Sequence, residues 1–260
     1  HFVGKVEDFV GGKLTRVICG RPATFADGSR GADERAEGRL REALTTLGFT
    51  DIRFELEPIA AAYHYEATLQ TPQTVLVGDF GGGTSDFTVM RLDPARRHVP
   101  DRRSDILATS GVAIAGNRYD SAVMRERLLP LFGSLAHYRT HRGAAPLKAA
   151  NYAHAALCAW DKIHALKGDI KIMEFIARMI KFSDDPEAFR RMDTLIRQNL
   201  GYDLFRSIEA AKISLSQDTS ATLRYTHPAL AIEKPLSRPE FETDTHEESA
   251  TILECLDTML

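Results

Sequence analysis

Residues 74–90 of the chain, T-V-L-V-G-D-F-G-G-G-T-S-D-F-T-V-M, place three consecutive glycines between two apolar runs. The runs at 74–80 and 87–92 are rich in Val, Leu, Phe and Thr, which favour extended structure, and each is about one strand long. The pattern therefore predicts a β-hairpin whose turn contains Gly81, Gly82, Gly83 and Thr84.

The composition of this turn favours phosphate binding. Glycine tolerates positive φ and has no Cβ, so an anion can approach the backbone and bind successive N–H groups, and Thr84 adds a hydroxyl donor. Asp79 and Asp86 have the wrong charge to contact phosphate, so they predict an intervening cation, most simply hydrated Mg²⁺. The alternative is a flexible hairpin tip with two solvated aspartates. A tip needs only one or two residues with positive φ, which favours the phosphate interpretation.

The same stretch resembles a known phosphate motif. Residues 79–86, D-F-G-G-G-T-S-D, are similar to the second phosphate motif of the superfamily of actin, hexokinase and the DnaK-type heat-shock chaperones. Residues 17–25, 48–49 and 57–63 resemble three further DnaK-type segments and occur in the DnaK-type order. The spacing is closest to the short, YegD-like bacterial members. The resemblance implies an α/β, actin-like (ribonuclease H-like) ATPase lobe with a mostly helical inserted subdomain, which binds ATP or ADP with Mg²⁺.

Glu57 and Pro58 begin the segment E-P-I-A-A-A-Y. In the resembling family this pair senses the nucleotide and couples two lobes, so the resemblance implies catalytic roles for Glu57, Asp79 and Asp86. From the residues alone, Pro58 suits a first helical turn and the alanines give a small helix face. An ordinary buried helix with an acid in its first turn is the alternative.

Residues 110–120 place Gly111 and Gly116 before a helix that we expect to begin near Asp120. They resemble a family turn that lies near the nucleotide phosphates, which implies that Gly116 binds the cofactor. Ala115 departs from the family pattern, because a glycine is expected there. The alternative role for Asp120 is to cap the helix.

Glu209, Lys212 and Ser216 are spaced at i, i+3 and i+7, which places them on one face of a helix predicted over 202–216. The resemblance implies that they hydrogen-bond the sugar and base of adenosine. The family usually has an Arg after the Lys, and here Ile213 removes that guanidinium stacking. An exposed Glu–Lys pair is the alternative.

The whole chain has 260 residues, 43% hydrophobic content and a net charge of −3, which predicts a globular protein with more than one core. No apolar stretch has membrane-spanning length, so we expect a cytoplasmic protein without a membrane partner. The slightly negative net charge favours a protein that does not bind nucleic acid. The cysteines are far apart in the sequence, so we expect reduced thiols and no zinc site. We expect the histidines between 137 and 164 to be solvated surface residues. These residues are Cys19, Cys158, Cys255, His137, His141, His154 and His164.

The pattern changes from α/β to helical at about Ala108. Before it we predict strands at 16–20, 52–56, 74–80 and 87–92 and helices at 33–47 and 58–71. After it we predict helices over 120–199, a strand pair over 221–232 and one long helix from Ser237, with Phe241, Ile252, Leu253 and Leu256 on its apolar face. In terms of the resembling family, 1–72 would complete a first lobe and crossing helix, 73–119 and 200–260 would form a second-lobe core, and 120–199 the helical subdomain.

The family's first phosphate loop and catalytic Lys are not found in these 260 residues. We therefore expect part of an ATPase domain, with weak nucleotide binding and little hydrolysis, from an intact chaperone-like ATPase that acts in the stress response on unfolded clients and with co-chaperones. Two alternatives from the same superfamily are a nucleotide-dependent filament or scaffold protein and a small-molecule kinase.

Overall fold

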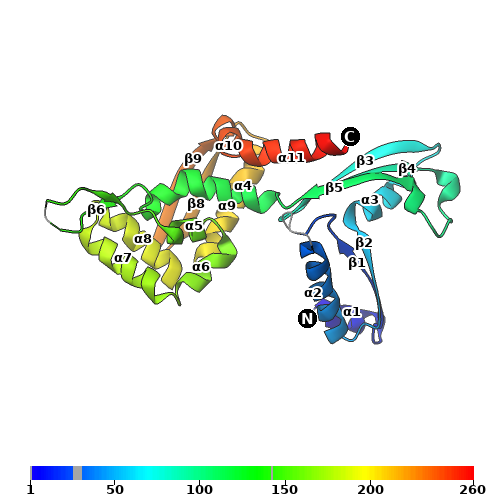
Figure 1. The fold of residues 1–260 in the computed structure, drawn as a ribbon, viewed down its shortest axis with the longest axis horizontal. Coiled ribbons are helices and arrows are strands. Elements are labelled where there is room, and N and C mark those ends of the chain that lie inside the picture. The colour runs from blue at the N-terminus through cyan, green and yellow to red at the C-terminus, as the bar shows by residue number, and fades with distance from the viewer. Residues whose placement is uncertain (1, 26–30, 142) are drawn as a thin grey trace. The chain divides into compact units, whose positions relative to one another are not determined.

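The computed structural model describes residues 2–25, 31–141 and 143–260. The chain has a mixed α/β fold that divides into two compact units (Figure 1). Unit 1 comprises His1–Gly116 and Ser249–Leu260, and unit 2 comprises Asn117–Glu248. In the part of the chain that the structure describes, no helix is both long enough and apolar enough to cross a membrane.

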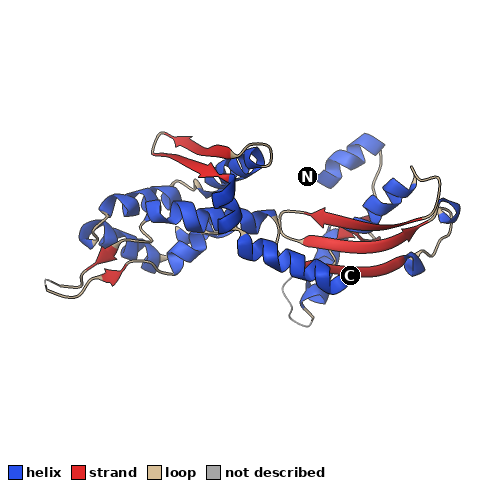
Figure 2. Ribbon diagram, turned by 90° about the horizontal axis from the view of Figure 1, so that it is seen from above, coloured by secondary structure: helices blue, strands red, loops and turns tan. Residues whose placement is uncertain are grey.

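The described residues of unit 1 form two small sheets. Strands β1 and β2 pair in parallel, and β3, β4 and β5 form an antiparallel sheet in that order (Figure 2). This confirms the predicted hairpin, the earlier strands and the two helices, although the second helix ends earlier than expected. The elements are α1 (Phe2–Val10), β1 (Arg16–Arg21), α2 (Ala32–Thr46), β2 (Asp51–Leu56), α3 (Glu57–Glu66), β3 (Gln73–Phe80), β4 (Ser85–Leu92) and β5 (Ile106–Val112).

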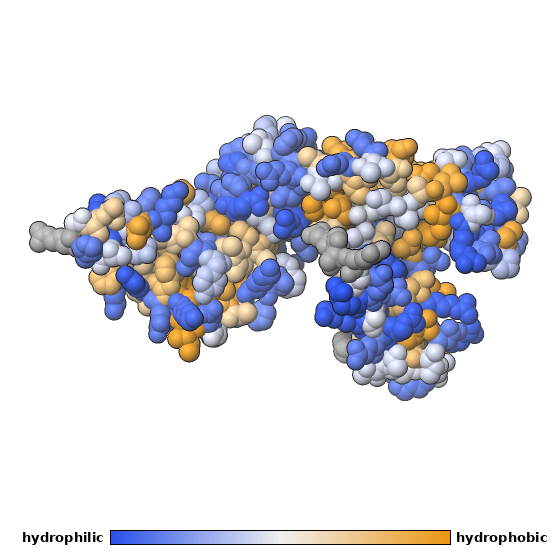
Figure 3. All heavy atoms as spheres, viewed as in Figure 1, coloured by the Kyte–Doolittle hydropathy of each residue, from blue (hydrophilic) through white to orange (hydrophobic). Residues whose placement is uncertain are grey.

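The core of unit 1 lies between α3 and one face of the antiparallel sheet. Ile59 and Ala62 of α3 are buried with Met90 and Leu92 of β4, and Val77 of β3 packs against them. Strand β3 alternates between partly buried and exposed residues, so its other side chains lie on the opposite face. Large apolar residues are exposed on β3 and β5, where Figure 3 shows a gathering of hydrophobic atoms. They are Leu76, Phe80 and Leu107.

Unit 2 is mostly helical and holds the larger core. Phe132, Phe189, Met192, Ile196 and Ile208 are among its fully buried side chains. Its helices are α4 (Gly116–Val123), a π-helical turn (Met124–Leu128), a 3-10 turn (Leu129–Phe132), α5 (Tyr152–Leu157), α6 (Trp160–Leu166), α7 (Ile170–Phe182), α8 (Pro186–Arg197), α9 (Gly201–Leu215) and α10 (Arg238–Asp244). Helix α11 (His246–Met259) begins in unit 2, and from Ser249 on it belongs to unit 1. Its strands are β6 (His137–Tyr138), β7 (Leu147–Lys148), β8 (Ser220–His227) and β9 (Leu230–Ser237).

Two predicted boundaries differ from the structure. Strand β5 continues the α/β part past Ala108, and the division between the units falls after Gly116. Helix α4 begins at Gly116 and not near Asp120. Asp120 therefore lies inside the helix, where the backbone N–H groups already have helical partners, so it cannot be the helix cap.

The predicted long C-terminal helix is two helices. Thr245 ends α10, since its φ and ψ of −110° and 12° are not helical. Its backbone N–H and its hydroxyl both donate to the Phe241 carbonyl, at 3.0 and 2.8 Å, and complete the last turn. The restart at α11 changes which residues face inward. Ile252 is buried as expected, whereas Leu253 is 58% exposed.

His154 is a buried residue, contrary to the predicted solvated position. Only 3% of it is exposed, and its Nε2 lies 3.1 Å from the Phe132 carbonyl oxygen. Its other ring nitrogen completes a capping box with Asn151 at the start of α5. Burial lowers the pKa of the His154 imidazole, which favours its neutral form. His141 and His164 are exposed, as predicted.

Candidate functional site

The hairpin of β3 and β4 brings Asp79 and Asp86 directly opposite one another. The two residues are register partners in the antiparallel ladder, one pair before the turn. The turn is closed by the Gly81 N–H, which donates to the Thr84 carbonyl over 3.0 Å. Like charges in such a cross-strand position repel one another. The pair therefore creates a concentration of negative charge beside a glycine turn.

Asp86 is held rigidly by the backbone that follows β1. Its Oδ1 accepts the Ala23 N–H at 2.6 Å and lies 3.4 Å from the Thr24 nitrogen, and only 1% of the residue is exposed. A Cβ on Gly111 of β5 would lie 2.4 Å from Oδ1, so glycine is required there. Burial raises the pKa of Asp86, and its hydrogen bonds with Thr84 and the two N–H groups oppose that rise.

Glu57 brings a third carboxylate near the same pair. It is the first residue of α3 and follows β2 without a loop. Its pKa is raised, first by burial and then by the charges of Asp79 and Asp86. Gly20 of β1 leaves room for it, because a Cβ there would lie 3.0 Å from the Glu57 Cγ. The structure thus brings all three predicted catalytic residues together within unit 1.

The carboxylates of this site suit a cation that also binds water or phosphate oxygens. Within residues 2–25, 31–141 and 143–260, no group of three His, Cys, Asp or Glu side chains could hold a metal by itself. Mg²⁺ commonly binds through one or two carboxylates and takes water and phosphate oxygens as its remaining ligands. Asp79 and Asp86 fit that pattern, with the buried Asp86 fixed in place and Asp79 partly exposed.

The turn glycines have a different backbone from the one predicted. Gly81 and Gly83 do not adopt the left-handed φ that the sequence suggested. A Cβ on Gly83 would meet no described atom within 4 Å, and one on Gly81 would come only to 3.6 Å from the Thr84 carbonyl oxygen. The chain's own conformation therefore does not require glycine at either position. What glycine provides there is open space along the backbone.

Gly116 lies next to this turn. Its N–H donates to the Gly81 carbonyl over 3.2 Å, which links the first residue of α4 to the hairpin. The Ser85 hydroxyl donates to the Ile114 carbonyl over 2.7 Å and fixes the same two segments. Gly116 therefore lies beside the glycine turn within unit 1.

The other predicted ligand residues lie in unit 2. Glu209 and Lys212 are on α9, and Ser216 follows its last residue with helical φ and ψ of −68° and −25°. Glu209 and Ser216 are exposed. The Lys212 ammonium lies 2.7 Å from Asp120 Oδ1 and forms an ion pair with that buried carboxylate. Ile213, which replaces the expected Arg, is 59% exposed.

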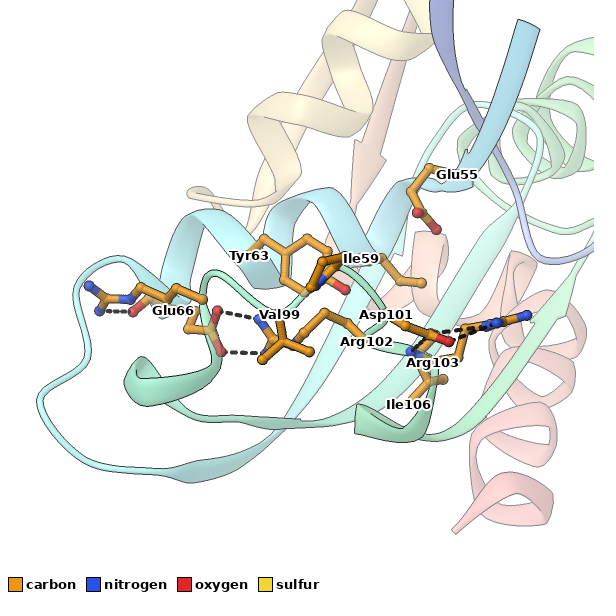
Figure 4. Close-up of a pocket in the computed structure, with 11 residues that line it drawn as sticks. Glu55, Ile59, Tyr63, Glu66, Val99, Asp101, Arg102, Arg103 and Ile106 are labelled. Carbon is orange, nitrogen blue, oxygen red and sulfur yellow. Dashed lines mark hydrogen bonds and ion pairs between the residues drawn. The ribbon is translucent and has the colours of Figure 1, made fainter.

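Sequence reasoning missed a buried ion cluster at the end of α3. The Arg102 guanidinium donates to both carboxylate oxygens of Glu66, at 2.7 and 3.1 Å (Figure 4). Its Nε donates to Asp105. Its Cζ lies 5.1 Å from the centre of the Tyr63 ring, within cation–π range. A cavity of about 730 Å³ lies beside the cluster. Glu66 and Arg102 are 36 residues apart, so no local pattern reveals them.

A comparison with protein families matches the first part of the chain. Residues 1–129 match the family model described as Hsp70 protein. The matched part contains the hairpin, its two aspartates, Glu57 and Gly116. Glu209, Lys212 and Ser216 lie beyond it.

Proposed function

Because the chain belongs to the Hsp70 protein family over residues 1–129, we propose that it is the nucleotide-binding part of a chaperone-like ATPase. In this proposal it has the actin-like, ribonuclease H-like fold of a YegD-like member and binds ATP or ADP with Mg²⁺. The intact parent hydrolyses ATP in the cytoplasm and works with unfolded clients or co-chaperones. The observation that carries the proposal is the opposed pair of Asp79 and Asp86 beside a turn whose glycines the fold itself does not require.

Charge decides how phosphate would be bound at the turn. Glu57, Asp79 and Asp86 repel an anion unless a cation lies between. Mg²⁺ held by Asp79 and Asp86 would supply that positive charge and polarise a phosphate oxygen. The backbone N–H groups of Gly82, Gly83 and Thr84 donate to phosphate oxygens, since the Gly81 N–H already donates to the Thr84 carbonyl and the Thr84 side chain is hydrogen-bonded to Asp86. Glycine lets the ligand lie against the backbone, which accounts for the open space at Gly83.

The adenosine contacts are proposed separately, on α9 of unit 2. The exposed Glu209 and Ser216 offer polar groups to a sugar or a base. Lys212 is fixed by its ion pair with Asp120, which holds the ammonium in one place. Burial raises the pKa of Asp120, and the Lys212 charge opposes that rise.

Calorimetry of ATP binding with and without Mg²⁺ tests the metal assignment. Asp79→Asn and Asp86→Asn each keep the side-chain size but remove a carboxylate, so Mg²⁺-dependent affinity should fall about tenfold or more. Asp101→Asn is the matched control, because Asp101 is an exposed aspartate of the same unit that pairs with Arg103. Unaltered Mg²⁺-dependent binding in both hairpin variants would show that Asp79 and Asp86 do not hold the metal.

A further inference from the structure

The hairpin of β6 and β7 in unit 2 borders a cavity that none of the proposed nucleotide contacts uses. Strands β6 and β7 pair with one another, and Tyr138 of β6 also bridges to Ser183, which ends α7 (Figure 1). The cavity has a volume of about 490 Å³, within the roughly 300–1,000 Å³ typical of small-molecule sites. The lining residues used below are His137, Tyr138, Arg139, Phe182, Ser183 and Asp184.

Two aromatic side chains give this cavity an apolar surface. Tyr138 is partly buried and packs against the core of unit 2, which restricts its ring. Phe182 is the last residue of α7 and is 61% exposed. A ligand that covered the Phe182 ring would remove apolar surface from water. The walls therefore favour a ligand with an apolar body, and a ring can pack against either aromatic face.

Two arginines beside this surface have no carboxylate partner among the described residues. Arg178 of α7 lies over the Tyr138 ring, with its Cζ 5.7 Å from the ring centre. Arg139 directly follows β6 and donates to the carbonyl of Ala144, which is a neutral acceptor. The positive charges of both guanidinium groups are therefore available to an anionic ligand.

The remaining charge at the cavity limits the ligand to a small negative charge. Asp184 is the only acidic residue among the described lining residues. Its carboxylate accepts the His137 N–H over 2.7 Å, and its own N–H donates to the His137 carbonyl over 2.9 Å. Arg139, Arg178 and Asp184 together leave one formal positive charge. A carboxylate matches this charge, whereas a phosphate monoester carries nearly two negative charges at neutral pH. The planar guanidinium also matches the geometry of a carboxylate.

We propose that this cavity binds a small organic acid, whose carboxylate contacts Arg139 and Arg178 and whose ring-bearing apolar body covers Phe182. The Ser183 hydroxyl supports this assignment. It is buried and has no hydrogen-bond partner among the described residues, so it has no bond to lose when it turns toward a ligand oxygen. The site belongs to unit 2, whereas the glycine turn belongs to unit 1, so the inference does not depend on the proposed function.

A pair of ligands that differ only in charge tests the site. Naphthylacetate and its neutral amide, naphthylacetamide, share one ring system. Two-dimensional NMR of the ¹⁵N-labelled chain is titrated with each ligand and with inorganic phosphate, which has no ring. Naphthylacetate should shift the amide signals of Tyr138, Arg139 and Ser183 saturably. Naphthylacetamide should bind about tenfold more weakly, because it loses hydrogen bonds between charged groups. Phosphate should leave these signals unchanged.

Substitution of the two arginines shows whether their charges hold the ligand. Arg139→Gln and Arg178→Gln should each weaken naphthylacetate binding about fivefold or more and leave naphthylacetamide binding unchanged. Arg190→Gln is the matched control, because Arg190 is an exposed arginine of α8 that already pairs with Glu187 over 2.9 Å. It should change neither affinity. Circular dichroism checks that each variant is folded.

Four results would overturn the organic-acid site. Equal binding of naphthylacetate and naphthylacetamide, or unchanged naphthylacetate affinity in both Arg139→Gln and Arg178→Gln, would show that the guanidinium groups do not hold a carboxylate. Phosphate that shifted the same amide signals would show an anion site that does not select an apolar body. Signals of Tyr138, Arg139 and Ser183 that stayed unchanged at millimolar naphthylacetate would show that the cavity does not take such a ligand.

Discussion

Removing the Arg102 guanidinium should destabilise unit 1 more than any change to its exposed charges. In Arg102→Met the side chain keeps much of its apolar stem but loses its bonds to Glu66 and Asp105. Those two carboxylates have only 3% and 5% of their side chains exposed, so they would be left buried with fewer partners.

The remaining partners set the size of the effect. Breaking a buried ion pair from one side costs about 3–5 kcal/mol. The Asp93 N–H still donates to Glu66 over 2.8 Å, and Arg96 still lies 3.1 Å from Asp105, so the lower end applies. A loss of about 3 kcal/mol corresponds to roughly a hundredfold faster hydrogen exchange, at 1.36 kcal/mol for each factor of ten.

Hydrogen–deuterium exchange followed by mass spectrometry measures the loss of stability in unit 1. Tryptophan fluorescence does not report on this unit, because the single tryptophan of the sequence, Trp160, belongs to unit 2. The peptides of α3 and β4 should exchange faster in Arg102→Met. Arg103→Met is the matched control, since Arg103 is exposed and pairs only at the surface with Asp101, and it should change little. Adding Glu66→Gln to Arg102→Met should restore part of the protection. Equal exchange in the Arg102 and Arg103 variants would refute the assignment.

Two further predictions concern the glycines and His154. Gly111→Ala should displace Asp86 from the Ala23 N–H and abolish Mg²⁺-dependent phosphate binding. Gly83→Ala should weaken phosphate binding and leave the circular dichroism spectrum unchanged. Equal losses of phosphate binding in the two variants would contradict the geometry. For His154 the folded pKa is lowered, so the unfolded state binds its proton first, and unit 2 should lose stability as pH falls below the ordinary value of 6.5. Urea unfolding followed by Trp160 fluorescence at about pH 7.5 and about pH 5.5 checks this, and His154→Gln should flatten the difference.

Local sequence patterns predicted the parts of the fold that depend on neighbours in the chain. The hairpin followed from two β-prone runs around the glycines, and the register then placed Asp79 opposite Asp86. Glu57 beside this pair was predicted only through the family resemblance, because nothing in its own segment indicates what lies across from it. The structure brings it there by joining α3 directly to β2.

Other features depend on contacts that no local pattern contains. The break at Thr245 lies where the backbone φ and ψ become non-helical, and a threonine inside an apolar pattern does not indicate such a break. His154 is buried with its Nε2 atom 3.1 Å from the Phe132 carbonyl oxygen. The two residues are 22 positions apart, so no local pattern indicates this contact. The glycine turn was predicted for the wrong reason, since open space and not positive φ distinguishes Gly81 and Gly83.

The central claim is that the turn at Gly81–Thr84 binds phosphate through a metal held by Asp79 and Asp86. Two-dimensional NMR of the ¹⁵N-labelled chain, titrated with tripolyphosphate in Mg²⁺ and then in EDTA, tests it most directly. We expect the amide signals of Gly81, Gly82, Gly83 and Thr84 to shift with Mg²⁺ present and to return when EDTA is added. Signals that stay unchanged at the turn, or that shift equally without Mg²⁺, would contradict the account.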